Sequence, residues 1–253
     1  MKILISILSH EGNGHYLALE NAIRETWGAG KSEHDNIVDI IYYYGNPSLE
    51  SDHKLDGDKL WVKSQEGYFK TWNKTLMMFD FISKNYEFDC LFRTNLSSYV
   101  DLKNLQNFVN KNYKENFYCG SFGNLSPGNF CSGAGYFLSK NLIELITSQG
   151  EKLFEESVDD LALGRFLHKK VEPVIGERFE GECSFEIVKS KLNKKSHCGA
   201  CWKNEPYDGS VNYFGKGSLY YDMDHYHYRV HTTQGNRRDD IKKMKYIHSL
   251  KNE

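Results

Sequence analysis

The feature that most constrains the fold is an alternation of short apolar segments with amphipathic helices, which starts at the first residues of the chain. Residues 2–8 are almost entirely aliphatic, and polar residues follow from Ser9. Four apolar residues then recur at spacings of three and four, the period of one helix face: Tyr16, Leu19, Ile23 and Trp27. A repeated strand–helix order of this kind predicts an α/β fold with a mostly parallel central sheet covered by helices.

The same alternation continues to about residue 175. Further strands are predicted at 37–43, 59–63, 88–92, 117–120, 134–138 and 171–175. Further helices are predicted at 67–84, 101–110, from the end of the 134–138 strand to about 148, and at 157–169. Asp101 is placed to cap the helix that follows it. The segments 45–58 and 121–132 are rich in Gly, Ser, Asp and Pro and are predicted to be loops.

Beyond residue 176 the pattern weakens. Residues 189–206 are Lys-rich and predict a loop or extension, 211–231 are dense in Tyr and His and look strand-like, and 237–250 predict a basic helix. The chain shows no internal repeat. We therefore expect one domain over residues 1–253, with a core at about 1–175 and a Tyr/His-rich C-terminal extension at about 176–253.

Composition narrows the function classes. At 253 residues the chain is long enough to bury a sizeable core, and its net charge of −2 gives no overall field that favours nucleic acid or an anionic membrane. The apolar run at residues 2–8 is too short to span a membrane and lacks a signal-peptide cleavage pattern. We expect a cytoplasmic protein whose six cysteines are reduced.

Four short motifs follow one another over roughly residues 1–170. They are AIRETWG at 22–28, GYFKTWNKT at 67–75, CSGAGYFLS at 131–139 and SVDDLALG at 157–164. In order and spacing they resemble motifs of GT-A glycosyltransferases, in particular the Fringe and β-galactosyltransferase group. The resemblance implies a Rossmann-like GT-A fold. It also implies an enzyme that moves a sugar from a nucleoside diphosphate sugar to a hydroxyl acceptor such as a glycan, with inversion.

The sequence departs from that group at the metal motif. Where the group carries Asp-Asp-Asp or Asp-x-Asp, this chain has Thr94-Asn95-Leu96-Ser97-Ser98. Neutral Asn and Ser oxygens do not replace two carboxylates on a hard cation. We therefore expect no cofactor, with bound Mn²⁺ or Mg²⁺ as the alternative. Thr94, Asn95 and Ser97 would then hydrogen-bond ribose or sugar hydroxyls.

An acidic pair opens the predicted helix at 157–169. Asp159 and Asp160 match the acidic pair of the resembling group, which implies that Asp160 is the catalytic base and that Asp159 orients it or caps the helix. The alternative is a helix N-cap followed by a first-turn acid, which is a common arrangement.

Without a metal, the leaving diphosphate must meet fixed cations or backbone amides. Arg229 is the first candidate, with His227 or His231 beside it, because His227, Arg229 and His231 would share one face of a strand. Further candidate cations are Arg24, Lys74 and Arg93. The His-rich face could instead bind a metal together with Asp222 or Asp224, or be an ordinary exposed strand.

The resemblance also places the nucleotide base and ribose near Ser9 and His10, which could equally just begin a turn. Gly133, Ala134 and Gly135 are small enough for a sugar to approach the backbone closely, or for a tight turn.

Two wider alternatives remain. The lost acidic motif is also typical of a non-catalytic GT-A-like module that binds a glycan or a nucleotide sugar. The Lys-rich run at 189–195 and the basic tail suggest, more weakly, a sugar transferase that acts on modified DNA. Cys198 and Cys201 form a CxxC pair, but no second pair stands at zinc-site spacing, so this segment reads as structural or acceptor-binding, with a metal as the alternative.

Overall fold

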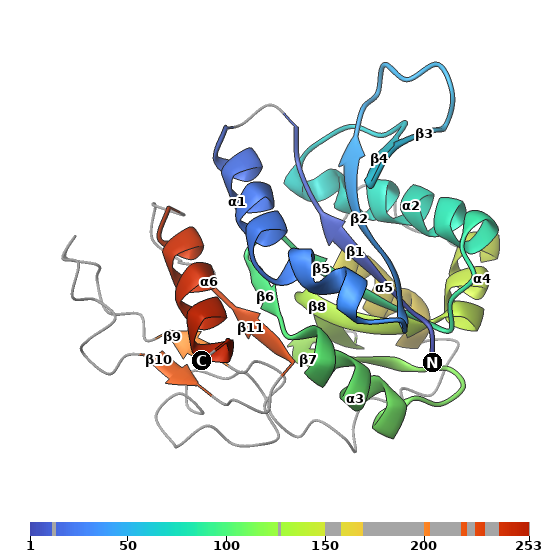
Figure 1. Cartoon of the computed structure of the whole chain (residues 1–253). Coiled ribbons are helices and arrows are strands. Elements are labelled where there is room, and N and C mark those ends of the chain that lie inside the picture. Colours follow the sequence, from blue (N-terminus) through green and yellow to red (C-terminus); the bar gives the residue numbers. More distant parts are fainter. Residues whose placement is uncertain are drawn as a thin grey trace.

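A computed structural model of the protein describes residues 1–11, 14–125, 128–149, 158–168, 200–202, 219–221, 226–230 and 238–252. Its centre is a seven-stranded sheet with the strand order β3-β4-β2-β1-β5-β8-β7 (Figure 1). The strands are β1 (Ile3–Leu8), β2 (Ile37–Gly45), β3 (His53–Asp56), β4 (Lys59–Val62), β5 (Cys90–Asn95), β7 (Tyr118–Leu125) and β8 (Gly128–Ser139). Two smaller sheets pair β6 (Ser98–Val100) with β11 (His227–Arg229), and β9 (Ala200–Trp202) with β10 (Leu219–Tyr221).

The direction of the strands confirms the predicted α/β class. β4, β2, β1 and β5 are mutually parallel, and within this sheet only β3 and β8 run the other way, so five of the seven strands share one direction. β1, which is apolar except for Ser6, lies in the middle of the sheet. Its residues Ile3, Ile5 and Ile7 belong to one buried cluster and Leu4 to the other, because successive side chains of a strand point to opposite faces.

Helices cover both faces of the sheet (Figure 1). On one face lie α1 (Gly14–Glu25) and α3 (Leu102–Asn112), and on the other lie α2 (Thr71–Asn85), α4 (Lys140–Gln149) and α5 (Asp159–His168). α6 (Arg238–Lys251) packs against α1 and β6. α1, α2 and α3 were predicted from their apolar periodicity, and helices were also predicted where α4, α5 and α6 lie. Asp101 caps α3 as expected, since its carboxylate accepts a hydrogen bond from the Asn104 amide at 2.9 Å.

Three segments predicted to be loops or extensions contain strands. Residues 45–58 include the edge strand β3, which is short and charged and therefore escapes an apolar pattern. Residues 121–125 and 128–132 belong to β7 and β8, which pair with each other, and 189–206 include β9, which pairs with β10. Composition misled the prediction because backbone pairing with a neighbouring strand stabilises a strand whose own side chains show no strand pattern. The strand predicted at 171–175 lies outside the described residues.

The C-terminal part of the chain returns to the centre of the molecule. β11 pairs antiparallel with β6, with Arg229 opposite Ser98 and His227 opposite Val100. Figure 1 shows β11 and α6 beside β6, next to the end of β5. Residues more than 120 positions apart in sequence are thereby brought together at the end of a central parallel strand.

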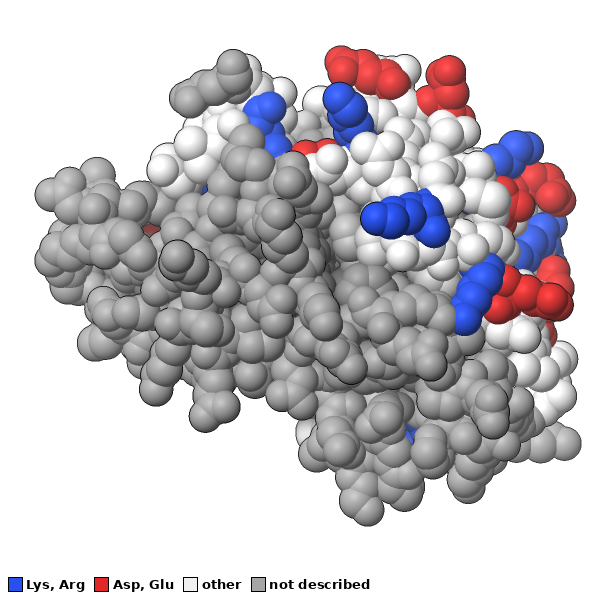
Figure 2. All heavy atoms as spheres, turned by 90° about the horizontal axis from the view of Figure 1, so that it is seen from below, with Lys and Arg blue, Asp and Glu red and all other residues white. Residues whose placement is uncertain are grey.

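The charge of the described surface is mixed. On the face shown in Figure 2, basic and acidic side chains alternate along one margin, in keeping with the net charge of −2. Within the described ranges, no helix has the length and apolarity needed to cross a membrane.

Candidate active site

Four parts of the chain meet at the end of β5. They are Arg93–Ser98, Gly133–Gly135 of β8, Asp159–Asp160 at the start of α5, and His227–Arg229 of β11, and we call them the candidate site. The Thr94 hydroxyl donates to the Ala134 carbonyl at 2.8 Å, and the Asn95 amide donates to the Gly133 carbonyl at 2.9 Å. Most of the residues proposed from the sequence as catalytic or substrate-binding thus lie within one hydrogen-bonded unit.

The buried part of the candidate site is an ion pair. The Arg93 guanidinium lies 2.5 Å from the Asp159 carboxylate, and the two residues are only 1% and 5% exposed. Arg93 also donates to the Tyr43 hydroxyl at 3.1 Å and to the Gly133 carbonyl at 2.5 Å. Burial raises the pKa of the Asp159 carboxyl and the Arg93 charge opposes that rise. Arg93 therefore holds Asp159 and β8 together.

Asp160 occupies a different environment. It is half-buried, and its two carboxylate oxygens accept hydrogen bonds from the backbone amides of Gly133 and Leu161, each at 2.8 Å. The first of these bonds fixes the carboxylate against β8. Of the two acids, Asp160 is the one placed toward the surface, while Asp159 is committed to Arg93.

The small residues of β8 are required by side-chain packing. A β-carbon added at Gly133 would lie 3.1 Å from an Arg93 nitrogen and 3.2 Å from an Asp160 oxygen, and one at Gly135 would lie 2.9 Å from the His227 ring. Both glycines lie within β8, at the point where its pairing with β7 shifts register, so the alternative of a tight turn is not what the structure shows. Because these glycines have no side chain, Arg93 of β5, Asp160 of α5 and His227 of β11 can lie close to the strand.

The segment that replaces the acidic metal motif contacts an arginine. Arg229 donates a hydrogen bond to the Asn95 side-chain oxygen, which also accepts the Ser97 amide at 3.0 Å. His227 is buried beside it, with its Nε2 3.0 Å from the Ser98 hydroxyl. The third residue proposed for this face, His231, lies outside the described residues. The Arg229 guanidinium therefore contacts the Asn95 amide, at a position where the resemblance implies a carboxylate.

A comparison with protein families gives a match that includes one of the four segments of the candidate site. Residues 19–127 match the family model of galactosyltransferases. The match runs from α1 to the end of β7 and includes Arg93–Ser98, so it confirms over that range the resemblance that the motifs indicated. It covers less than half of the chain, and Gly133–Gly135, Asp159–Asp160 and β11 lie beyond it. No curated protein matches the sequence.

Solved structures show only distant likeness. A glycosyltransferase involved in glycosylation of the major capsid of PBCV-1 is 13% identical with a TM-score of 0.46, over 96% of this chain and 99% of that one. The glycosyltransferase GlyE of Streptococcus pneumoniae is 14% identical with a TM-score of 0.36, over 67% and 44%. A 4-diphosphocytidyl-2C-methyl-D-erythritol synthase of Anaerococcus prevotii scores 0.41 at 14% identity, over 69% and 86%. Likenesses at this distance carry no information on function.

Three further proposed residues, Ser9, His10 and Lys74, lie near the end of β1. The Lys74 ammonium is buried and donates to the Ser9 carbonyl at 2.9 Å and to the Glu66 carboxylate at 2.8 Å. Burial lowers the pKa of Lys74, and Glu66 opposes that effect. Ser9 directs its hydroxyl to Glu20 at 3.4 Å, and the His10 ring packs 5.1 Å from that of Tyr16. These contacts position the loop that follows β1.

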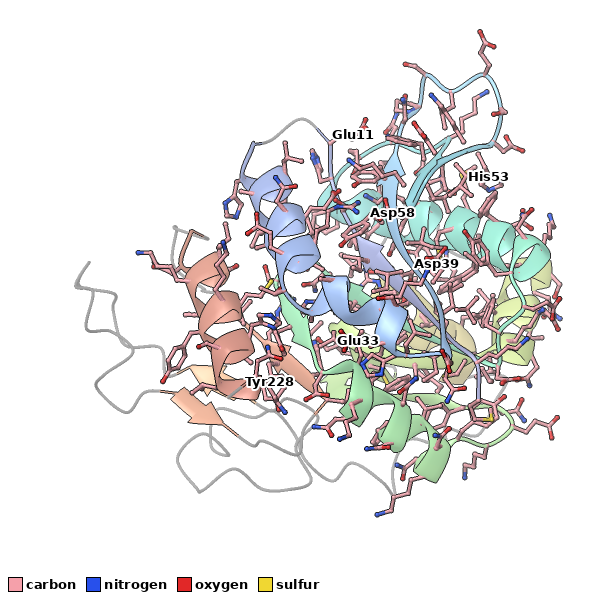
Figure 3. All side chains as sticks on the ribbon, in the orientation of Figure 1. Glu11, Glu33, Asp39, His53, Asp58 and Tyr228 are labelled. Carbon is pink, nitrogen blue, oxygen red and sulfur yellow. The ribbon has the colours of Figure 1, made fainter. Side chains whose placement is uncertain are left out.

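Arg24 is separate from the candidate site. It pairs with Asp58 at 2.5 Å and with Glu20 at 3.0 Å, and its guanidinium lies 4.2 Å from the centre of the Tyr42 ring. Figure 3 places Asp58 beside β2, apart from Tyr228 of β11. A shallow groove of about 490 Å³ opens here, but its arginine and lysine are paired with its aspartates. The structure thus gives Arg24 a structural role.

Sequence reasoning missed an acidic pair on α6. Asp240 is completely buried and accepts a hydrogen bond from the Ser97 hydroxyl at 3.0 Å, and Asp239 is buried beside it. Lys243 is also buried, one turn along the helix. The segment reads as a basic tail, yet Asp239, Lys243 and Ile247 recur at a spacing of four, which could have revealed a buried face. The hydrogen bond from Ser97 to Asp240 therefore joins α6 to the segment Thr94–Ser98.

The pKa of Lys243 gives a pH prediction. Burial lowers that pKa to about 8, with Asp240 and Asp239 opposing. Between about pH 8 and the ordinary lysine pKa near 10.4, the unfolded chain binds more protons than the folded one, so folding becomes more favourable as pH rises. We expect the free energy of unfolding of the wild type, measured with urea relative to that of Lys243→Met, to increase from pH 8 to pH 10. A pH-independent difference would contradict the burial of a charged amine.

The described residues do not resemble a Mn²⁺ or Mg²⁺ site. Among them there is no group of three or more His, Cys, Asp and Glu side chains arranged to hold a metal. The Asn95 side-chain oxygen accepts hydrogen bonds from Arg229 and from the Ser97 amide, and the arginine charge would repel a cation there. Asp222, Asp224, Cys198 and the run at 189–195 lie outside the described residues.

Proposed function

We propose that the protein is a glycosyltransferase that moves a sugar from a nucleoside diphosphate sugar to a hydroxyl group of an acceptor, such as a glycan, with inversion at the anomeric carbon. The match of residues 19–127 to galactosyltransferases supports the reaction class. The observation that carries the proposal is that Asp160 and Arg229 are held by two neighbouring strands. The Asp160 carboxylate accepts from the Gly133 amide of β8, and Arg229 donates to Asn95 of β5, whose amide donates to the Gly133 carbonyl. A base and a fixed cation are thereby held on one framework.

Asp160 is the proposed base. In an inverting transfer, the acceptor oxygen attacks the anomeric carbon while the bond from that carbon to the diphosphate oxygen breaks, and the acceptor proton passes to a carboxylate. Asp160 is half-buried, and its carboxylate is oriented by the backbone amide of Gly133 rather than by another side chain. Asp159 positions it, since the buried pair with Arg93 fixes the first turn of α5.

Arg229 is proposed to take the role of a divalent metal. The leaving diphosphate gains negative charge as the sugar departs, and a prearranged cation stabilises that charge without needing to reorganise. A guanidinium suits phosphate oxygens because its N–H groups lie in one plane and can bind two oxygens at once. The hydrogen bond to Asn95 orients the guanidinium, which gives the altered motif a function of its own.

The experiment that tests this function begins with binding. We expect one family among UDP, GDP, CDP and ADP sugars to raise the melting temperature, because a ligand bound only by the folded state stabilises it. Transfer with that donor should continue in EDTA. Arg229→Ala should lose roughly 10²- to 10³-fold in kcat, as for removal of one charge-stabilising donor, and Arg229→Lys should recover part of it. Loss of activity in EDTA that Mn²⁺ restores would contradict the metal-free mechanism.

A second candidate is a binding module without catalysis. The observation that favours it is that both oxygens of Asp160 accept backbone hydrogen bonds, which is also how a purely structural carboxylate is held. Such a module would still bind a nucleotide sugar or a glycan through Asn95 and Arg229. It would neither transfer nor hydrolyse the donor, so the fate of the bound donor separates the two candidates.

A further inference from the structure

Two aromatic side chains stand out on the described surface. Tyr68 and Phe69 are 72% and 66% exposed, more than any other large apolar side chain described. They are consecutive, and their rings meet edge to face at 5.1 Å and 83°. Exposing two adjacent large rings leaves apolar area in water that the fold itself does not use.

The backbone holds these rings in place. They lie in a short 3-10 helix, Tyr68–Lys70, directly before α2. Gly67 enters it with a φ of 143°, a conformation that other residues rarely adopt, and accepts a hydrogen bond from the Lys70 amide at 3.1 Å. The Thr71 hydroxyl donates to the Tyr68 carbonyl at 3.1 Å. A surface that is prearranged in this way loses little conformational entropy when a ligand binds.

The same contacts connect the rings to the candidate site. The Thr71 hydroxyl that bonds to Tyr68 also accepts the backbone amide of Asp159 at 3.1 Å. Two hydrogen bonds therefore join the aromatic pair to the residue next to Asp160. On the other side, Glu66 accepts the Gly45 amide at 2.6 Å and pairs with Lys74 at 2.8 Å. The backbone that carries the rings is thus joined to the first turn of α5, which holds the acidic pair.

We propose that Tyr68 and Phe69 form a platform on which a sugar ring of the acceptor stacks, an inference that rests on the proposed transferase function. A pyranose offers an apolar C–H face and a polar rim, which suits an aromatic face beside hydrogen-bonding groups. The acceptor hydroxyl must come within hydrogen-bonding distance of the base, so its sugar has to lie next to Asp160. The connection through Thr71 and Asp159 puts the two rings on that side.

Binding can be measured without any reaction. The probes are the methyl glycosides of glucose, galactose, mannose and N-acetylglucosamine at millimolar concentration, observed by saturation-transfer NMR. We expect at least one glycoside to receive saturation on its C–H face, and the Tyr68→Ala/Phe69→Ala double variant to weaken its binding roughly tenfold. Leu17→Ala, which removes an exposed side chain of α1, is the matched control and should bind as the wild type does.

Activity provides a second readout. In the double variant, hydrolysis of the donor by water should be unchanged, while the KM for a transferred glycoside should rise by about tenfold. Tyr68→Phe, which keeps the ring, should stay near the wild type. If the glycosides bind through the rings but no nucleotide sugar is ever consumed, the platform stands and the transferase function fails. If donor is consumed but the double variant binds and uses glycosides as the wild type does, the platform fails alone.

Three other results would overturn the platform. The first is that no glycoside in the panel binds the wild type. The second is that the double variant loses nucleotide binding, which would make the rings a base-stacking surface. The third is a concentration-dependent dimer, seen by sedimentation, that the double variant abolishes, which would make a second copy of the chain the occupant of this surface.

Discussion

Asp160→Asn is expected to lower kcat by roughly 10²- to 10⁴-fold while leaving the donor affinity close to that of the wild type. An asparagine keeps the size of the side chain and can still accept the Gly133 amide through its oxygen, while its NH2 group loses the hydrogen bond from the Leu161 amide. It has no lone-pair basicity to take the acceptor proton, which is the function that the carboxylate supplies. Initial rates of transfer, with donor affinity measured separately by calorimetry, provide the two readouts.

The matched control for this experiment is Asp239→Asn. Asp239 is also an acid in the first turn of a helix, although it is buried where Asp160 is half-buried, and it lies on α6, outside the candidate site. We expect that variant to change stability and to leave kcat near that of the wild type. An Asp160→Asn enzyme with wild-type kcat would remove Asp160 as the base. The absence of any donor turnover in the wild type would instead support the non-catalytic binding module.

The α/β class could be predicted from the sequence because the patterns that indicate strands and helices are local. The apolar run that became β1 is visible without any partner, and so are the periodic faces of α1, α2 and α3. The approximate place of the candidate site was also predictable, since chain segments that follow parallel strands gather at one edge of a sheet. The motif at Thr94–Ser98 was found in this way, whereas the acidic pair in the first turn of α5 was chosen because of the resemblance to glycosyltransferase motifs.

The contacts that define the site could not be predicted, because they join residues that are distant in sequence. The pairing of β11 with β6 puts Arg229 against Asn95, and nothing local to either residue indicates that register. The pair of Arg93 with Asp159 was likewise hidden. From the sequence alone, Arg93 was a candidate for the substrate and Asp159 a companion of the base. The structure shows that they satisfy each other in the interior.

These contacts also give the altered metal motif a consistent physical interpretation. In a metal-dependent site, a divalent cation would bridge acidic residues and the diphosphate. Here Asn95 is neutral and holds a guanidinium, and Ser97 is tied to Asp240 of α6. Both side chains are thus bound by the C-terminal part of the chain, Asn95 by an arginine of β11 and Ser97 by a carboxylate of α6.

The second large effect is expected from Arg93→Met, which should reduce the free energy of unfolding by about 3–5 kcal/mol. Removing one partner of a buried ion pair leaves the other charge without compensation. Asp159 would remain in an environment where burial already raises its pKa, now without the opposing guanidinium. An acid whose pKa is raised in the folded state disfavours folding most strongly when the solution pH is high, so the loss should be larger at pH 8 than at pH 5.

Urea unfolding of the wild type, Arg93→Met, Asp159→Asn and the double variant tests this interpretation as a thermodynamic cycle. The double variant should be less destabilised than the sum of the two single variants, because neither buried charge is then left alone. Exposed pairs provide the control: Lys245→Ala, which breaks the surface contact with Glu25, should change stability by under about 1 kcal/mol. Strict additivity of the two site variants would mean that Arg93 and Asp159 act independently, and the buried ion pair would then not be what positions Asp160.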